Sequence, residues 1–371
     1  MHILLAPDSF KESLSAKQVA ESLKKGFQEA LPNASFDLLP IGDGGEGTMD
    51  TLAGVLNLTE SHTQVTGPFG QPVSMPYYQR DQMAFFEMAS LVGLASIPAE
   101  KRNPLELETR GIGELILQLV DQGIKTICVG IGGSATNDGG IGMAAGLGVA
   151  FYDEQGHLLR PVGASLGRVA RIDTSAVPKA LQEIDLQVLT DVTNLLCGSQ
   201  GATYIFGGQK GLNPLLFPAV DQAMQKFYQL VDSRILTIEG AGAGGGMAAG
   251  LVAFAGGQIS SGIEKSLDLI DFDRIVQKAD LVVVGEGRMD LQSLSGKAPV
   301  GVAQRTPDQI PVLAICGALA SDLPAFPSHH IDAAFSILTG PCEVTEALAQ
   351  AESNLISCAR NIGNLLKMKT N

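Results

Sequence analysis

The sequence predicts an α/β protein of two domains, one of which is assembled from both ends of the chain. A length of 371 residues is long for a single hydrophobic core. The chain opens with alternating strand-like and helix-like segments, and a polar loop follows each apolar strand segment. This alternation changes near Thr63 and returns near Leu281. We therefore expect residues 1–65 and 280–371 to form one domain, and residues 66–279 to be inserted into it.

The N-terminal segment reads as two strand–loop–helix units. Strands are expected at 2–6 and 36–39, and Ser15 is expected to cap a helix that runs to about Leu31. The second strand leads into the glycine-rich segment 43–48 and a helix that ends near Leu56. Lys11 and Asp43 follow the ends of these strands, where open α/β sheets bind their ligands.

The middle segment contains the glycine-rich loops. A hairpin is expected from strands at 73–78 and 83–88, followed by a helix over 115–122 and a buried strand over 126–129. The loop Gly130-Ile-Gly-Gly-Ser-Ala-Thr-Asn-Asp-Gly-Gly140 then leads into a helix over 141–150. A strand over 187–189 leads to the polar loop that begins at Asp191, and the glycine run 240–246 precedes a helix over 247–255.

The C-terminal segment returns to alternating strands and helices. Its strands are expected at 281–284, 312–316 and 333–337, and its helices at 300–304 and 343–366.

Composition excludes several classes of partner. A net charge of −14 argues against a nucleic acid or an anionic membrane as the partner. Five dispersed cysteines without a CxxC pair predict a reduced protein that has neither a disulfide framework nor a zinc site. The start of the chain reads as a strand and not as a signal peptide, and no apolar run is long enough to span a bilayer. We therefore expect a cytoplasmic protein.

The loop 130–140 has the composition of a phosphate-binding turn. Gly132 and Gly133 allow the backbone to approach an anion, and Ser134 and Asn137 add side-chain donors. Asp138 supplies a carboxylate that could hold a metal ion. The alternative is a tight strand-to-helix turn in which Asp138 caps the helix.

Charged residues gather on the other loops as well. The basic residues close to glycine-rich or acidic loops are Lys11, Arg110, Lys210, Arg288 and Lys297, and the loop carboxylates are Asp8, Asp43, Glu46, Asp138, Asp191, Glu286 and Asp290. Phosphoryl transfer requires such cations for the phosphates and such carboxylates for Mg²⁺ and for the attacking hydroxyl. Neither the Walker A pattern nor the dinucleotide-binding fingerprint is present, since Ala298 follows Lys297 and no glycine follows the first strand.

These motifs together resemble the bacterial glycerate kinase family. The matching segments run in order along almost the whole chain: 6–16, 43–48, 130–140, 191–194, 206–211, 240–247, 285–290 and 295–299. Two positions depart from the pattern, because Leu195 and Gly208 stand where prolines are expected. Both departures affect loop stiffness and leave the charged groups intact.

The resemblance implies an ATP-dependent kinase that phosphorylates D-glycerate, with the 2-phospho product slightly favoured. It also implies a flavodoxin-like, doubly wound parallel sheet with an inserted second α/β domain. The expected partners are glycerate, ATP and Mg²⁺, with no nucleic acid or membrane. Two other function classes stay open: a dinucleotide-dependent oxidoreductase of small hydroxy acids, and a non-catalytic two-lobed ligand-binding protein. Which domain binds ATP also stays open.

Candidate site residues follow from the loops and the resemblance. The candidates for catalysis are Asp191, Lys11, Asp43 and Arg288. The candidates for nucleotide binding are Gly132, Gly133, Ser134, Asn137, Lys210, Gly244, Gly245 and Lys297. Asp138, Glu286 and Asp290 are candidate metal ligands. Asp191 is expected to orient the glycerate hydroxyl or to bind Mg²⁺, and the alternative for it is a residue that only shapes its turn.

Overall fold

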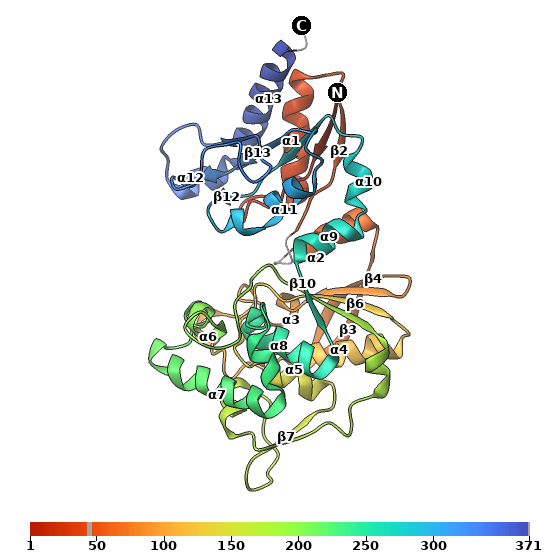
Figure 1. Ribbon diagram of the computed structural model, residues 1–371, viewed down its shortest axis with the longest axis vertical. Helices are drawn as coiled ribbons and strands as arrows, with labels where there is room; N and C mark the ends of the chain where they lie inside the picture. The colour runs from red at the N-terminus through yellow and green to blue at the C-terminus, as the bar shows by residue number, and fades with distance from the viewer. Residues whose placement is uncertain (43–46, 370–371) are drawn as a thin grey trace. The chain divides into compact units, whose positions relative to one another are not determined.

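The computed structural model describes residues 1–42 and 47–369, and the chain divides into two compact units (Figure 1). One unit contains the N-terminal segment and Gly262–Asn371, and the other contains Asn57–Ser261. Both boundaries differ from the sequence-based expectation: residues 57–65 belong to the inserted unit, and 262–279 belong to the unit made from the chain ends.

Pairing and charge explain these two boundaries. Strand β3 (Thr59–Thr66) is antiparallel to β4 (Pro72–Arg80) along its whole length. Helices α9 (Gly262–Leu269) and α10 (Phe272–Val276) are tied to α11 (Ala298–Arg305) by Arg305. The Arg305 guanidinium lies 2.6 Å from Asp268 Oδ1 and 2.8 Å from Asp273 Oδ1.

The unit made from both chain ends is built on a five-stranded parallel sheet. Its strands are β1 (His2–Leu5), β2 (Ser35–Leu38), β11 (Leu281–Val284), β13 (Val312–Cys316) and β15 (Ala333–Ser336). They lie in the order β15-β13-β11-β1-β2, which is the flavodoxin-like order, since β11 is the third strand of this sheet along the chain. Strand β1 pairs with β11, so the two ends of the chain share one sheet and the predicted fold class is confirmed.

Helices α1 (Ala16–Ala30) and α13 (Ala351–Lys369) pack together beside this sheet (Figure 1). Ser15 caps α1 in a capping box with Gln18, as the sequence predicts. The single C-terminal helix expected over 343–366 is wrong, because α12 (Val344–Ala349) ends at Ala349 and Gln350 separates it from α13. Neither Gly nor Pro marks this break in the sequence. The unit also contains the short strands β12 (Arg288–Met289) and β14 (Ala318–Leu319). Helix α2 (Thr48–Leu56) comes after residues 43–46 in the chain.

The inserted unit is built on a six-stranded mixed sheet in the order β10-β9-β6-β5-β4-β3. Strands β5 (Met83–Glu87), β6 (Thr126–Gly130), β9 (Asp185–Leu189) and β10 (Gln258–Ser260) are parallel, and β4 pairs antiparallel with β5 as the predicted hairpin. Its helices are α3 (Ala89–Val92), α4 (Arg110–Asp121), α5 (Ile141–Gly146), α6 (Ala202–Phe206), α7 (Phe217–Val231) and α8 (Ala243–Ala255). A small antiparallel pair, β7 (Ala150–Tyr152) and β8 (Arg171–Asp173), completes the unit.

Glycines set the bounds of two helices in this unit: α5 ends earlier than expected, whereas the regular part of α8 matches the expected range 247–255. Helix α5 stops at Gly146, short of residue 150, and Gly148 with a φ of +103° turns the chain into β7. Helix α8 opens with three glycines of positive φ, so regular helix begins at Met247. Within the described part of the chain, no helix combines the length and apolar character needed to cross a membrane.

Candidate functional site

The unit made from the chain ends contains a cavity of about 610 Å³ at the carboxyl ends of its strands. Its charged lining residues are Asp8, Lys11, Glu12, Glu286, Arg288 and Lys297, from the loops after β1 and β11 and from the start of α11. Residues after β13 and β15, and residues of α12, complete the wall. This is the edge at which open α/β sheets bind ligands. It brings together Lys11, Glu286, Arg288 and Lys297 of the predicted site.

Close backbone crossing positions the charged segment 286–288. A Cβ on Gly285 would lie 2.1 Å from Ile315 O, and one on Gly317 would lie 2.2 Å from Gly287 O. The Ala318 N–H donates to Gly287 O at 3.0 Å, and β12 pairs with β14. Side chains larger than hydrogen at these positions would separate the two loops, so the glycines here serve packing.

Glu286 is the buried acid of this cavity. Its side chain is 8% exposed, and Oε1 has no hydrogen-bond partner among the described residues. Burial raises the pKa of Glu286 to about 7, opposed by a hydrogen bond from Ser293 and by the charge of Lys297. Nearby Asp8 and Asp290 raise the pKa further. An unpaired buried carboxylate oxygen costs stability, so Glu286 has the character of a ligand-binding group.

Asp290, also predicted to bind metal, forms a local turn. Its Oδ1 accepts the backbone N–H groups of Gln292 at 2.9 Å and Ser293 at 3.1 Å. Asp290 is absent from the cavity lining, so these contacts favour a role in shaping the loop before Lys297. Lys297 is the N-cap residue of α11.

The inserted unit has a smaller cavity, of about 150 Å³, on its glycine-rich loops. Five of the residues predicted to bind the nucleotide line it: Gly132, Gly133, Ser134, Lys210 and Gly244. Leu94, Ile131, Thr190, Val192, Phe206, Gln209 and Ala243 complete the lining.

Lys210 is the charged group of this smaller cavity. It is 3% exposed, and its Nζ donates to Ser134 Oγ at 2.8 Å and to Thr136 O at 2.7 Å. Burial lowers the pKa of Lys210 to about 7, and nearby Asp138 opposes this effect. Lys210 therefore holds the glycine-rich loop in shape and forms part of the cavity lining.

Asp138 lies inside the fold and does not line this cavity. Its Oδ2 accepts the Thr109 hydroxyl at 2.7 Å, and its Oδ1 accepts the Gly140 N–H at 3.1 Å. Burial raises the pKa of Asp138, and these hydrogen bonds oppose the shift. This geometry matches the alternative of a turn residue, although Gly140 and not Asp138 is the N-cap residue of α5. We do not retain Asp138 as a candidate metal ligand. Thr109, which sequence analysis did not single out, is its partner.

Asn137 and Gly245 also belong to the packing of the loops. Asn137 is fully buried and donates to Thr203 Oγ1 at 2.9 Å. Gly245 has a φ of +71°, and a Cβ on it would lie 2.0 Å from Thr136 O. Its carbonyl accepts the Gly139 N–H at 3.0 Å. The two glycine-rich loops therefore cross at Gly245, which explains why this position needs glycine without invoking a phosphate.

The remaining predicted residues are Asp191 and Asp43. Asp191 follows β9, half-buried, and its Oδ1 accepts the Ser261 hydroxyl at 3.0 Å. Its neighbours Thr190 and Val192 line the smaller cavity. Asp43 lies outside the described residues.

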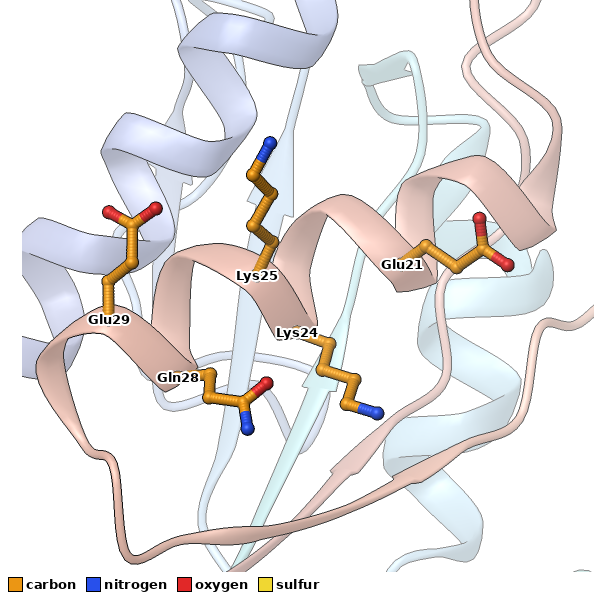
Figure 2. Close-up of a pocket in the computed structure, with 5 residues that line it drawn as sticks. All are labelled: Glu21, Lys24, Lys25, Gln28 and Glu29. Carbon is orange, nitrogen blue, oxygen red and sulfur yellow. The ribbon is translucent and has the colours of Figure 1, made fainter.

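A third surface depression has no such chemistry. It lies on the outer face of α1 and is lined by Glu21, Lys24, Lys25, Gln28 and Glu29 (Figure 2). All five side chains come from one helix, and they point in different directions (Figure 2). This is the solvated face of an amphipathic helix.

Sequence reasoning missed the apolar part of the larger cavity. Ile337, Leu338, Val344, Ala347 and Leu348 line it from the segment after β15 and from α12. The sequence contained only a weak signal for this wall: α12 carries apolar residues but buries none of them in the core.

Comparison with known proteins agrees with these observations. The model of the glycerate kinase family matches residues 3–367. A glycerate kinase of Neisseria meningitidis serogroup B is 55% identical over 99% of both chains. The glycerate 2-kinase of Escherichia coli K12 is 41% identical over 99% of this chain and 98% of its own. A crystal structure assigned as glycerate kinase 2 of Salmonella typhimurium LT2 superposes with a TM-score of 0.86 at 40% identity, covering 100% of this chain and 99% of that one. The chain therefore belongs to the glycerate kinase family.

Proposed function

We propose that this protein transfers the γ-phosphoryl group of ATP to a hydroxyl of D-glycerate. The observation that carries the proposal is the larger cavity, in which three cations and a buried carboxylate meet at the carboxyl ends of a flavodoxin-like sheet. Family membership over nearly the whole chain names the reaction. No observation favours the oxidoreductase or the non-catalytic binding protein.

The residues of the larger cavity fit Mg²⁺. Among the described residues, no group of three or more His, Cys, Asp or Glu side chains forms a ready metal site. Mg²⁺ does not need one, because in kinases it binds one or two carboxylates together with substrate phosphates. Glu286, with its unpartnered Oε1, and Asp8, whose charge acts on it, are the residues that would hold the ion. Bound there, Mg²⁺ would neutralise charge on the phosphates.

Three basic side chains of the larger cavity can balance the phosphate charge that Mg²⁺ leaves. Lys11, Arg288 and Lys297 line the cavity and can balance phosphate oxygens, which an otherwise acidic protein must do locally. The N-terminus of α11, with Lys297 as its N-cap residue, adds the positive end of the helix dipole. In the inserted unit, Lys210 and Ser134 offer donors to a second anionic group.

Asp191 is the group that we propose to orient the glycerate hydroxyl. Its Oδ1 is fixed by the Ser261 hydroxyl, and it belongs to the loop that contributes Thr190 and Val192 to the smaller cavity. A carboxylate held in this way can accept a proton from an attacking hydroxyl.

We propose phosphorylation at the 2-hydroxyl, on the strength of the relative named glycerate 2-kinase. A coupled assay of ADP release with D-glycerate, L-glycerate and lactate, with and without Mg²⁺, tests the reaction. Phosphorus NMR of the product distinguishes 2-phosphoglycerate from 3-phosphoglycerate. We expect Mg²⁺-dependent ADP release with D-glycerate, and background release with saturating Mg²⁺ would reject the proposal.

A further inference from the structure

The larger cavity has two chemically different walls. What we call the charged wall consists of Asp8, Lys11, Glu12, Glu286, Arg288 and Lys297. Ile337, Leu338, Val344, Ala347 and Leu348 form the apolar wall, which comes from the segment after β15 and from α12. With Mg²⁺ held by Asp8 and Glu286 as proposed above, the three cations of the charged wall favour an anionic group at one end of the ligand, and the apolar wall favours an apolar group at the other.

The apolar wall is unusual because two of its large side chains are open to solvent. Val344 is 71% exposed and Leu338 is 40% exposed. Isolated exposed apolar residues need no explanation, but here they share one concave surface with six charged groups. A bound flat apolar group would remove them from water, which is favourable.

The two substrates of the proposed reaction differ in whether they have an apolar part that could bind to the apolar wall. Each carbon of glycerate carries oxygen, so glycerate has no apolar part to place on this wall. A purine nucleotide has a flat base at one end and a triphosphate at the other. At about 610 Å³ the cavity also falls in the range of about 300–1,000 Å³ typical of drug-sized ligands, whereas the cavity of about 150 Å³ in the inserted unit lies below it.

We infer that the cavity of the chain-end unit is the nucleotide site, with the purine on the apolar wall and the phosphates on the charged wall. The inference rests on the proposed function, and it assigns ATP to the cavity of Lys297 and not to the glycine-rich loops 130–140 and 240–246. It adds residues 337–348, which carry no motif, to the nucleotide-binding machinery.

Cys342 provides a direct test, because it lines this cavity and is exposed. The other four cysteines, all in the described part of the chain, are buried or partly buried. Burial raises the pKa of Cys197 and of Cys316 to about 12, which keeps both thiols protonated and slow to react. Iodoacetamide should therefore alkylate Cys342 first in the native enzyme, and Cys342→Ser should abolish this fast labelling.

The measurement is the rate of Cys342 alkylation in the full-length protein with added ligand. Mg²⁺-ADP at about ten times its Kd leaves about a tenth of the sites free, so labelling should slow about tenfold. D-glycerate at saturation should leave the rate unchanged. Protection by D-glycerate but not by ADP would overturn the inference.

A matched pair of substitutions on α12 gives a kinetic readout. Ala347→Phe fills the apolar wall, and Ala349→Phe makes the same change on the same helix outside the lining. Ala347→Phe should raise the KM for ATP at least about tenfold and leave the KM for glycerate unchanged, while Ala349→Phe should change neither. An unchanged KM for ATP in Ala347→Phe would reject the inference.

The two proposals fail in different ways. If the wild-type enzyme phosphorylates glycerate but ADP does not protect Cys342, the nucleotide site lies elsewhere and the function stands. If ADP protects Cys342 but no tested hydroxy acid is phosphorylated, the proposed acceptor is wrong and the nucleotide site stands.

Discussion

Replacing Glu286 by Gln should stabilise the protein and inactivate it. Gln is nearly isosteric with Glu and cannot ionise, so the change isolates the charge of the buried carboxylate. In the native protein this side chain is 8% exposed, and its Oε1 has no hydrogen-bond partner among the described residues. A neutral amide in the same place costs less to bury.

The pKa of Glu286 sets the magnitude. Burial raises it from 4.5 to about 7, and a gap of about 2.5 pH units corresponds to about 3 kcal/mol. Because the folded protein binds this proton more tightly than the unfolded chain does, the free energy of unfolding falls as pH rises from about 4.5 to about 7. Glu286→Gln removes this loss. The free energy of unfolding of the variant should therefore exceed that of the wild type by almost nothing at pH 4.5 and by about 3 kcal/mol at pH 8.

Urea unfolding of both proteins at a series of pH values measures this difference. In parallel, kcat with D-glycerate should fall about 10²-fold or more if the carboxylate holds Mg²⁺. Mg²⁺ with ADP should raise the melting temperature of the wild type more than that of the variant. A variant that is no more stable at pH 8, or one that keeps normal turnover, would refute the reasoning.

Three further substitutions test the inserted unit. Gly245→Ala should lower the free energy of unfolding, measured with urea, by about 2–5 kcal/mol, because it adds left-handed backbone strain and an overlap with Thr136 O. The control is Gly256→Ala, at a φ of +67° with no neighbour within 4 Å, which should cost only about 1–2 kcal/mol. Lys210→Met should cost about 1–3 kcal/mol through two lost hydrogen bonds. Since the pKa of Lys210 is lowered from 10.5 to about 7, the unfolded chain binds the extra proton, and the wild type should gain stability over this variant as pH rises from 7 to about 10. Asp191→Asn should reduce kcat about 10²-fold with little change in melting temperature, and normal turnover would return Asp191 to a turn-shaping role.

The central strands β11 and β13 of the chain-end unit were predictable because they are buried on both faces. Leu281–Val284 and Val312–Cys316 are continuous apolar runs, and each was located to the residue. The capped start of α1 was equally clear, because Ser15 and Gln18 form a local motif. The break at Gln350 had no local signal and was missed.

In the candidate site, too, some features were predictable from the sequence and others were not. Lys11, Glu286, Arg288 and Lys297 were predictable as a group, since strand-end loops of one parallel sheet meet at one edge. Asp138 and Asp290 had the same position in sequence, yet their oxygens accept hydrogen bonds inside their own turns. A carboxylate after a strand can face either a ligand or its own backbone, and sequence position does not distinguish the two.

Local sequence thus determined the fold class, the loops that carry charge and the family resemblance, because strand periodicity, helix capping and glycine-rich turns depend only on residues close together in the chain. Only the tertiary structure decided where the two units begin, why Gly245 must be glycine, and which acids face a cavity. It also brought the apolar residues of 337–348 to the same cavity as Lys11 and Lys297. These features depend on contacts between residues that are far apart in the chain, where burial and close backbone approach, and not local propensity, set the outcome.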